Sequence, residues 1–256
     1  MNFDYDFTLL LLIFMRMSGC ILLNPILGRK NIPIAIKIGL ALMLSVFSYK
    51  LVPAQTIEIS SFLVFFVELL KELFVGFIVG YIIQLFMSVI MIGGESLDMQ
   101  IGFSMSKIYD PQSNISMPVS GSLINAMFIL IFFASNSHLT LIRVFVKLCT
   151  MVPYGSLTFK AGLFENLAGL FSLILIYAVK MSLPVLAAEL ITEIAVGIVM
   201  RAVPQIDVFT INIQMKVMIG FVIILLMVPS LSMFLERLIT LMFDNINGVF
   251  KVLAAT

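Results

Sequence analysis

Acidic residues and a single histidine are the side chains of this sequence that could perform chemistry. Glu189 and Glu193 stand one helical turn apart in an apolar run, where two carboxylates could relay a proton or act as general acid and base. The alternative, which we favour, is a structural pairing with Lys180, Arg201 or a partner subunit. His138 has no acidic residue one helical turn away, so the helical zinc-protease pattern is missing.

Motifs of other enzyme classes are missing as well. The sequence has neither the G-x-S-x-G turn of hydrolases nor a phosphate-binding Walker loop. Cys20 and Cys149 lie within apolar runs, without metal-ligand spacing around them, so we expect small buried side chains and no disulfide between them. We therefore expect no enzyme activity, no catalytic residue, no cofactor and no bound metal.

The composition is that of an integral membrane protein. Of the 256 residues, 61% are hydrophobic and 11% are charged, whereas a soluble domain is roughly half apolar and a quarter charged. The net charge of +1 provides no basic face for nucleic acid. The N-terminal MNFDYDF lacks the positive leader of a secretory signal, so we expect the first apolar run to be a retained membrane helix.

The hydrophobic pattern predicts an all-α, polytopic helical membrane protein that forms one domain over residues 1–256. A bilayer core is crossed by roughly 20 apolar helical residues. About six long apolar segments reach or approach this length: residues 7–27, 33–52, 61–92, 123–152, 163–201 and 217–243.

Several of these segments are expected to be interrupted. Residues 61–92 are too long for one simple span, and residues 123–152 are split by the polar stretch 135–138, which suits a hairpin or a re-entrant pair, with His138 as a polar cap at its tip. Residues 163–201 are expected to break at 182–184. A turn is expected at 202–214, and Pro229 should kink the last segment.

The short loop after the first segment indicates the orientation. Arg29 and Lys30, with Lys37 nearby, form the clearest basic cluster. The positive-inside rule places this cluster in the cytoplasm and the acidic N-terminus outside.

Charged residues within the apolar segments indicate protein contacts. A charge at the centre of a membrane helix costs roughly 2.5–3.5 kcal/mol. Seven charged residues lie within or beside apolar runs: Arg16, Glu68, Lys71, Glu72, Lys180, Glu189 and Glu193. We expect their helices to pack against each other or against partner subunits. Gly76-x-x-x-Gly80 is typical of a closely packed helix pair.

The residues of the stretch 93–121 do not fit a lipid-facing helix. The stretch contains helix-breaking residues together with charged and apolar side chains. Irregular backbone at membrane depth needs protein or cavity water around it, so the stretch either covers one end of a helical bundle or enters a water-filled cavity.

Two motifs make the sequence similar to a known family. The first is Gly94-x3-Asp98-x-Gln100-x-Gly102-Phe103, followed by Asp110-Pro111 and Pro118. The second is Gly197-x3-Arg201-x2-Pro204-Gln205-x2-Val208-Phe209, followed by Lys216 and Gly220. Their order and spacing resemble the signatures of the FliR-type subunit of the flagellar export gate. Asp207 departs from a frequent asparagine, and residues 211–214 replace a stretch that usually has glycine and proline.

The resemblance implies a function in protein export. Members of this family form the core of an export channel with P-type and Q-type subunits in the bacterial inner membrane, within the flagellar basal body. Bent helical hairpins, the B-type export protein as a further partner and unfolded exported proteins as substrates are also implied. The central loop of the family lies in the closed pore as a plug.

The resemblance also implies roles for particular residues. The pore plug would comprise Phe103, Met105, Ile108, Asp110, Pro111, Met117 and Pro118. Its hinges would be Gly102 and Gly121. Contacts with other subunits are implied for Glu68, Lys71, Glu72, Gly76, Gly80, Glu189, Glu193, Arg201, Pro204, Gln205 and Phe209.

Other functions remain alternatives at this point. An injectisome subunit of the same family would have the same signatures. A secondary transporter would also use broken helices and intramembrane charges, but inverted halves are not detectable in this sequence. A membrane-embedded hydrolase based on Glu189, Glu193 and His138 is the weaker alternative, because no nucleophile or metal set accompanies them.

Overall fold

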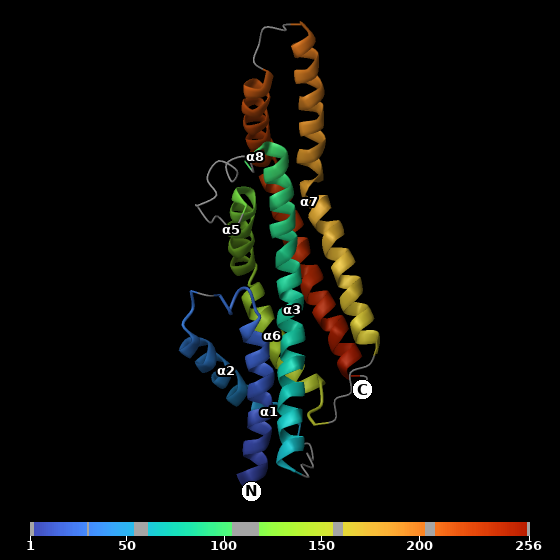
Figure 1. Cartoon of the computed structure of the whole chain (residues 1–256). Helices are drawn as coiled ribbons and strands as arrows, with labels where there is room; N and C mark the ends of the chain where they lie inside the picture. Colours follow the sequence, from blue (N-terminus) through green and yellow to red (C-terminus); the bar gives the residue numbers. More distant parts are fainter. Residues whose placement is uncertain are drawn as a thin grey trace. The chain divides into compact units, whose positions relative to one another are not determined.

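The computed structural model describes residues 3–29, 31–53, 61–103, 118–155, 161–202 and 208–254. All secondary structure in these ranges is helical (Figure 1). The helices are α1 (Phe3–Leu22), α2 (Ile34–Tyr49), α3 (Phe62–Ile101), α5 (Val119–Ala134), α6 (Ser137–Met151), α7 (Ala161–Ala202) and α8 (Val208–Ala254). The predicted all-α class is confirmed.

Helix length and composition also confirm a polytopic membrane protein. Among the described residues, α3, α7 and α8 are each long and apolar enough to cross a membrane. Helices α5 and α6 add a fourth span if they are counted as one broken span. Helices α1 and α2 are apolar but shorter.

The break expected at residues 182–184 is wrong, and the second half of the turn expected at 202–214 is helical instead. Helix α7 runs through Pro184 without a break, and α8 begins at Val208, inside the stretch expected to be a turn. In an apolar environment an unpaired backbone group is costly, so a helix that loses one hydrogen bond at a proline still continues. The Ser182 hydroxyl, just before Pro184, donates to the Val179 carbonyl at 3.1 Å.

The central stretch is also more helical than the sequence suggests. Helix α3 continues through Gly93 and Gly94 to Ile101, and α5 begins directly after Pro118. The irregular segment expected at 93–121 is therefore shorter at both ends. Tertiary contacts of the two glycines outweigh their low helix propensity.

The break at residues 135–138 is confirmed, although its details differ from the expectation. Asn136 has φ 57°, the left-handed conformation that ends one helix and starts another. The Ser135 amide donates to Ile131, and the Leu139 amide donates to Asn136. His138 lies in the first turn of α6, so Asn136 and not His138 occupies the capping position.

The chain forms two compact units. Unit 1 consists of Met1–Met87, Asn136–Phe171 and Ile239–Thr256, and unit 2 consists of Ser88–Ser135 and Ser172–Leu238. Helices α3, α7 and α8 contribute residues to both units. The expectation of a single domain stays a prediction.

Glycines allow α1 and α3 to approach closely in unit 1. A Cβ atom on Gly76 would lie 2.8 Å from the Cys20 nitrogen, and one on Gly80 would lie 2.9 Å from the Leu23 Cβ. On the opposite helix, a Cβ on Gly19 would lie 2.9 Å from the Phe77 nitrogen. The close helix contact predicted from Gly76-x-x-x-Gly80 is therefore confirmed. Cys20 and Cys149 are both buried and unbridged, as predicted.

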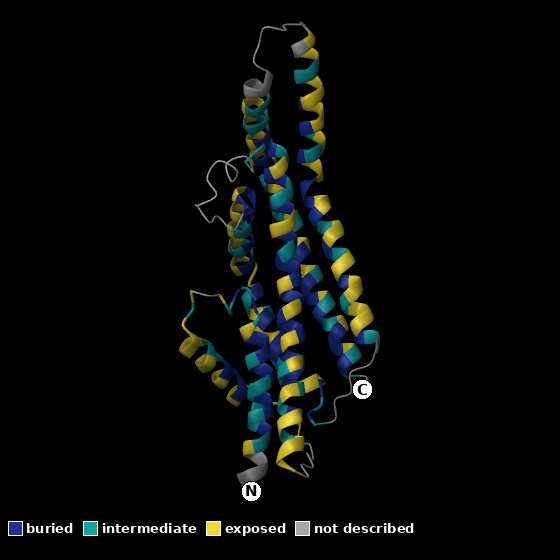
Figure 2. Ribbon diagram, in the orientation of Figure 1, coloured by how far each residue is buried: buried dark blue, intermediate teal, exposed yellow. Residues whose placement is uncertain are grey.

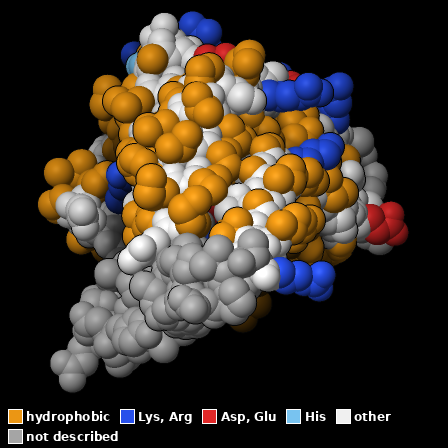
Figure 3. All heavy atoms as spheres, turned by 90° about the horizontal axis from the view of Figure 1, so that it is seen from above, with side chains coloured by type: hydrophobic (Ala, Val, Ile, Leu, Met, Phe, Trp, Pro, Cys, Tyr) orange, Lys and Arg blue, Asp and Glu red, His pale blue; other side chains and the backbone are white. Residues whose placement is uncertain are grey.

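Much of the outward-facing surface is apolar. Figure 2 shows exposed residues along the length of α7 and α8, and these include large side chains such as Ile191 (68% exposed) and Leu226 (75% exposed). Apolar side chains also dominate the face shown in Figure 3. Contiguous apolar surface of this kind is suited to lipid or to protein partners.

Candidate functional site

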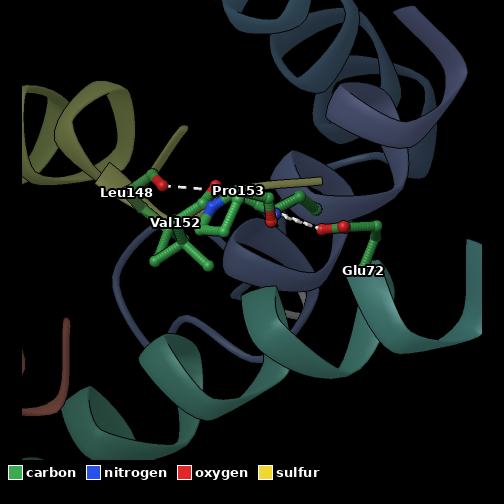
Figure 4. Close-up of polar contacts among 5 residues, drawn as sticks. Glu72, Leu148, Val152 and Pro153 are labelled. Atoms are coloured by element: carbon green, nitrogen blue, oxygen red, sulfur yellow. Dashed lines mark hydrogen bonds and ion pairs between the residues drawn. The ribbon is translucent and has the colours of Figure 1, made fainter. Parts of the chain in front are cut away.

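The centre of unit 1 is a buried ion pair between α1 and α3. The Arg16 Nε and Nη2 atoms each lie 2.6 Å from Oε2 of Glu72 (Figure 4). Both side chains have an exposed fraction of 0%. Since α1 and α3 also approach closely at Gly76, the ion pair fixes the rotation of one helix against the other.

Arg16 also binds the end of α6. Its Nη1 donates to the Leu148 carbonyl at 3.1 Å and to the Val152 carbonyl at 2.8 Å, and its Nη2 donates to Pro153 at 3.2 Å (Figure 4). With the hydrogen bond from Nε to Glu72, the guanidinium donates four hydrogen bonds, and Nη2 adds a charge contact to the same carboxylate oxygen. The last carbonyls of a helix carry partial negative charge, so a cation is favourable there. Arg16 therefore ties α1, α3 and α6 together.

An aromatic ring covers the guanidinium. The Arg16 Cζ atom lies 3.7 Å from the centroid of the Tyr154 ring, within the range of a cation–π contact. Tyr154 lies between α6 and α7, and burial raises its pKa, so its hydroxyl stays neutral. The cluster is thus a buried structural contact among α1, α3 and α6.

Sequence reasoning identified both charges but not their pairing. Glu68, Lys71 and Glu72 lie at helical spacing, at which they can pair with each other. Lys71 does pair with Glu68 at 2.7 Å, whereas Glu72 turns to Arg16, 56 residues earlier in the chain. An arginine within an apolar helix requires an acidic partner, and this signal could have suggested the pair.

A second buried carboxylate organises the start of α5 in unit 2. The Val119 amide donates to Oδ2 of Asp98 at 2.6 Å, and the Ser120 amide donates to Oδ1 at 3.0 Å. The residue before α5 is Pro118, which offers no side-chain cap. Asp98, which is 1% exposed, therefore supplies from α3 the cap that α5 lacks.

Helical spacing explains the first signature motif. Gly94 and Asp98 stand one turn apart on the same face of α3. A Cβ on Gly94 would lie 2.7 Å from the Gly121 nitrogen, so this glycine admits the first turn of α5. At Gly102, φ is +93° and its amide donates to the Asp98 carbonyl at 3.1 Å, which ends α3.

The predicted plug falls only partly on described residues. Phe103 follows Gly102 and is half-buried, and Pro118 is buried at the start of α5. Gly121 lies in the first turn of α5, where it packs against Gly94; its role as a hinge stays a prediction. The remaining plug residues lie outside the described ranges: Met105, Ile108, Asp110, Pro111 and Met117.

The two glutamates of α7 pair with neither of the two cations of this chain that the sequence suggested. Glu193 forms an ion pair with Lys216 of α8, and neither Lys180 nor Arg201 takes that place. Glu189 is 1% exposed, and its two oxygens have no hydrogen-bond partner in the part of the chain that the structure describes. A Cβ on Gly220 would lie 3.1 Å from Oε1 of Glu189.

The second signature motif is described in part. Arg201 is exposed in the last turn of α7, and Phe209 lies in the first turn of α8. Pro204 and Gln205 lie outside the described residues. Within the ranges described, no three His, Cys, Asp or Glu side chains could together hold a metal ion.

Comparison with known proteins relates the chain to bacterial protein export. Residues 7–242 match the model of a family described as bacterial export proteins, family 1. The flagellar biosynthetic protein FliR of Escherichia coli (strain K12) is 26% identical over 239 residues, which cover 93% of this chain and 91% of the relative. FliR of Bacillus subtilis (strain 168) is 26% identical over 260 residues, with 98% and 97% covered. FliR of Aquifex aeolicus (strain VF5) is 26% identical over 223 residues, with 87% and 86% covered.

Proposed function

Since this chain belongs to the bacterial export proteins, family 1, as a FliR-type membrane component of the flagellar export apparatus, we propose that it forms a protein-export channel with P-type and Q-type subunits. The family match across residues 7–242 is the observation that supports the proposal most strongly. The B-type export protein is a further expected partner, and unfolded proteins are the substrates. An injectisome role is the less favoured alternative, because the relatives named above are flagellar.

The apolar surface is a second argument for partner subunits. The buried charges are a weaker argument for partner subunits than the sequence suggested. Glu72, Glu68 and Glu193 already have cationic partners within the chain. Large exposed apolar side chains on α7 and α8 would instead be covered by neighbouring helices or by lipid.

Co-purification tests the proposed assembly. The tagged full-length chain, extracted from native membranes in mild detergent, should retain P-type and Q-type subunits in fixed proportion. The chain expressed without them should be poorly folded and protease-sensitive. A monodisperse, protease-resistant chain that purifies alone from native membranes would contradict the proposal.

The segment between α3 and α5 is proposed to be the pore plug. Asp98 and the Gly94–Gly121 contact hold its two ends together, and only glycine readily adopts the φ of Gly102. The ends of the segment are therefore held at one place, next to the last turn of α3. Methionines such as Met105 and Met117 can repack around a passing chain.

Deletion of residues 107–117 from the assembled complex should leave assembly intact and let small ions cross the membrane. Replacement of the same residues by a Gly/Ser segment of equal length is the matched variant, since it keeps the connection but removes the apolar side chains. Conductance of reconstituted vesicles is the measurement. Impaired assembly without any leak would identify the segment as a cap of the helical bundle.

Localisation follows from the same proposal. The chain would reside in the bacterial inner membrane at the flagellar basal body, with its N-terminus extracytoplasmic. Arg29, Lys30 and Lys37 would then face the cytoplasm.

Proton transfer by Glu189 is the competing function, and one observation is compatible with it. Glu189 is buried without a hydrogen-bond partner among the described residues, and a buried carboxyl of this kind is stable only when protonated or neutralised. We propose that Glu189 is structural. Glu189→Gln should then lower the amount of assembled complex, and export should fall only in proportion to that loss. Normal assembly with abolished export would identify Glu189 as a proton carrier. Glu193→Gln is the control, because Glu193 is 46% exposed and its ion pair contributes little.

A further inference from the structure

Helices α1 and α2 of unit 1 form a wedge that opens toward the loop connecting them. The second half of α2 is buried through Ala41, Leu44, Ser45 and Ser48. At its beginning, Ile34 and Ile38 are 68% and 45% exposed, and Figure 2 shows the same change along the helix. The two helices therefore pack closely at one end only.

A groove of about 200 Å³ lies within this wedge. Its walls include Phe14, Ser18 and Leu22 from α1 and Ile34, Lys37 and Ile38 from α2. The Ser18 hydroxyl is already used, because it donates to the Met15 carbonyl at 2.8 Å. A water molecule needs two to four polar partners, which these walls do not provide. An apolar group is the occupant that fits the groove.

Basic side chains belong to the groove wall and to the loop between α1 and α2. The Lys37 Nζ donates to the Gly28 carbonyl at 2.9 Å, which uses one of its three N–H donors. The Nε of Arg29 donates to the Pro25 carbonyl at 3.4 Å, and the side chain is exposed. The sequence from residue 7 to residue 53 contains no aspartate or glutamate, so no acidic residue of this stretch opposes an anion here.

The loop that carries these cations has a defined shape. The Asn24 side-chain oxygen accepts hydrogen bonds from the amides of Ile26 at 2.8 Å and Leu27 at 3.1 Å. The Gly28 amide donates to the Asn24 carbonyl at 2.6 Å. The position of the basic groups relative to the groove is therefore set by the local backbone.

We propose that this groove binds one acyl chain of an anionic phospholipid, with the lipid phosphate held by Lys37 and Arg29. The apolar walls accept the acyl chain, and the two cations select the head group. Basic pockets between membrane helices recognise anionic lipids in this way. The inference rests on α1 and α2 and does not depend on the proposed export function.

The absence of tryptophan from the sequence allows a direct test. Ile38→Trp places a fluorophore in the groove, and Phe221→Trp places one on the exposed surface of α8, where Phe221 is 52% exposed. The full-length chain in its native complex is reconstituted into phosphatidylcholine vesicles. A small fraction of the lipid is phosphatidylglycerol or phosphatidylcholine brominated in its acyl chains. The fluorescence difference between variant and parent complex isolates the new tryptophan.

Brominated phosphatidylglycerol should quench the fluorophore of Ile38→Trp at a much lower mole fraction than brominated phosphatidylcholine. The reason is that each basic residue strengthens the binding of an anionic lipid about fivefold. Adding Lys37→Gln should reduce this preference about fivefold. Lys50→Gln, which removes an exposed cation at the other end of α2, should leave it unchanged. The fluorophore of Phe221→Trp should be quenched equally by both lipids.

Equal quenching of Ile38→Trp by the two lipids would overturn the head-group assignment. Absence of quenching by either lipid, in Ile38→Trp and in Ile34→Trp alike, would overturn the proposal entirely. Ile34→Trp, at a more exposed position of the same wall, provides a second reporter if Ile38→Trp prevents assembly.

Discussion

Arg16→Met should abolish most of the stability of unit 1. The substitution leaves the Glu72 carboxylate buried without its cation and removes the donors that cap the end of α6. Breaking a buried ion pair from one side costs roughly 3–5 kcal/mol, a large part of the 5–15 kcal/mol that stabilises a typical domain. The fraction of chain that survives limited proteolysis in the assembled complex is the measurement, and we expect it to fall severely.

Removing both charges should be less damaging than removing one. Arg16→Met combined with Glu72→Met replaces the pair by apolar side chains of similar volume, a change that is often neutral for buried pairs. The carbonyls at the end of α6 still lose their donor, so rescue should be partial. Arg143→Met, at an exposed position of α6, is the control and should have little effect. A double variant that is less stable than Arg16→Met would show that the ion pair does not organise unit 1.

Asp98→Ala should release the start of α5 from α3. The amides of Val119 and Ser120 would lose their acceptors, and the buried Ser120 donor left unpaired costs roughly 1–3 kcal/mol. Hydrogen exchange of these two amides should accelerate accordingly in the assembled complex. If the segment between α3 and α5 plugs the pore, the same variant should also raise ion leakage.

Two further variants separate the cap from the charge of Asp98. Asp98→Asn keeps one oxygen that can accept a hydrogen bond, so its effect should be smaller than that of Asp98→Ala. Asp244→Asn changes an exposed aspartate of α8 and should alter neither exchange nor leakage. Unchanged protection of Val119 and Ser120 in Asp98→Ala would contradict the capping role.

The sequence predicted features that depend on local pattern. Apolar length identified the helices, and Gly76-x-x-x-Gly80 identified a close helix contact, because small residues at this spacing share one helix face. The break near Asn136 was visible as a run of polar residues. Each of these signals is confined to a few neighbouring residues.

Features that depend on contacts between distant segments were missed or misjudged. Helical spacing relates Glu72 to Glu68 and Lys71, but only the packing of α1 on α3 brings Arg16 within reach. In the same way, Gly94 suggested a break, whereas the approach of α5 makes a glycine favourable inside a continuous helix. Local propensity is regularly overridden by tertiary contacts of this kind.

Photo-crosslinking to a stalled substrate tests the central claim, that this chain lines a protein-export channel. An exported protein fused to a stably folded domain is trapped during transit, and a photoreactive amino acid is placed at Phe103 or, as the control, at the outward-facing Ile191 of α7. The account predicts a substrate crosslink from position 103 that requires the stalled fusion, and none from position 191. A stalled substrate that crosslinks equally at both positions, or at neither, would contradict it.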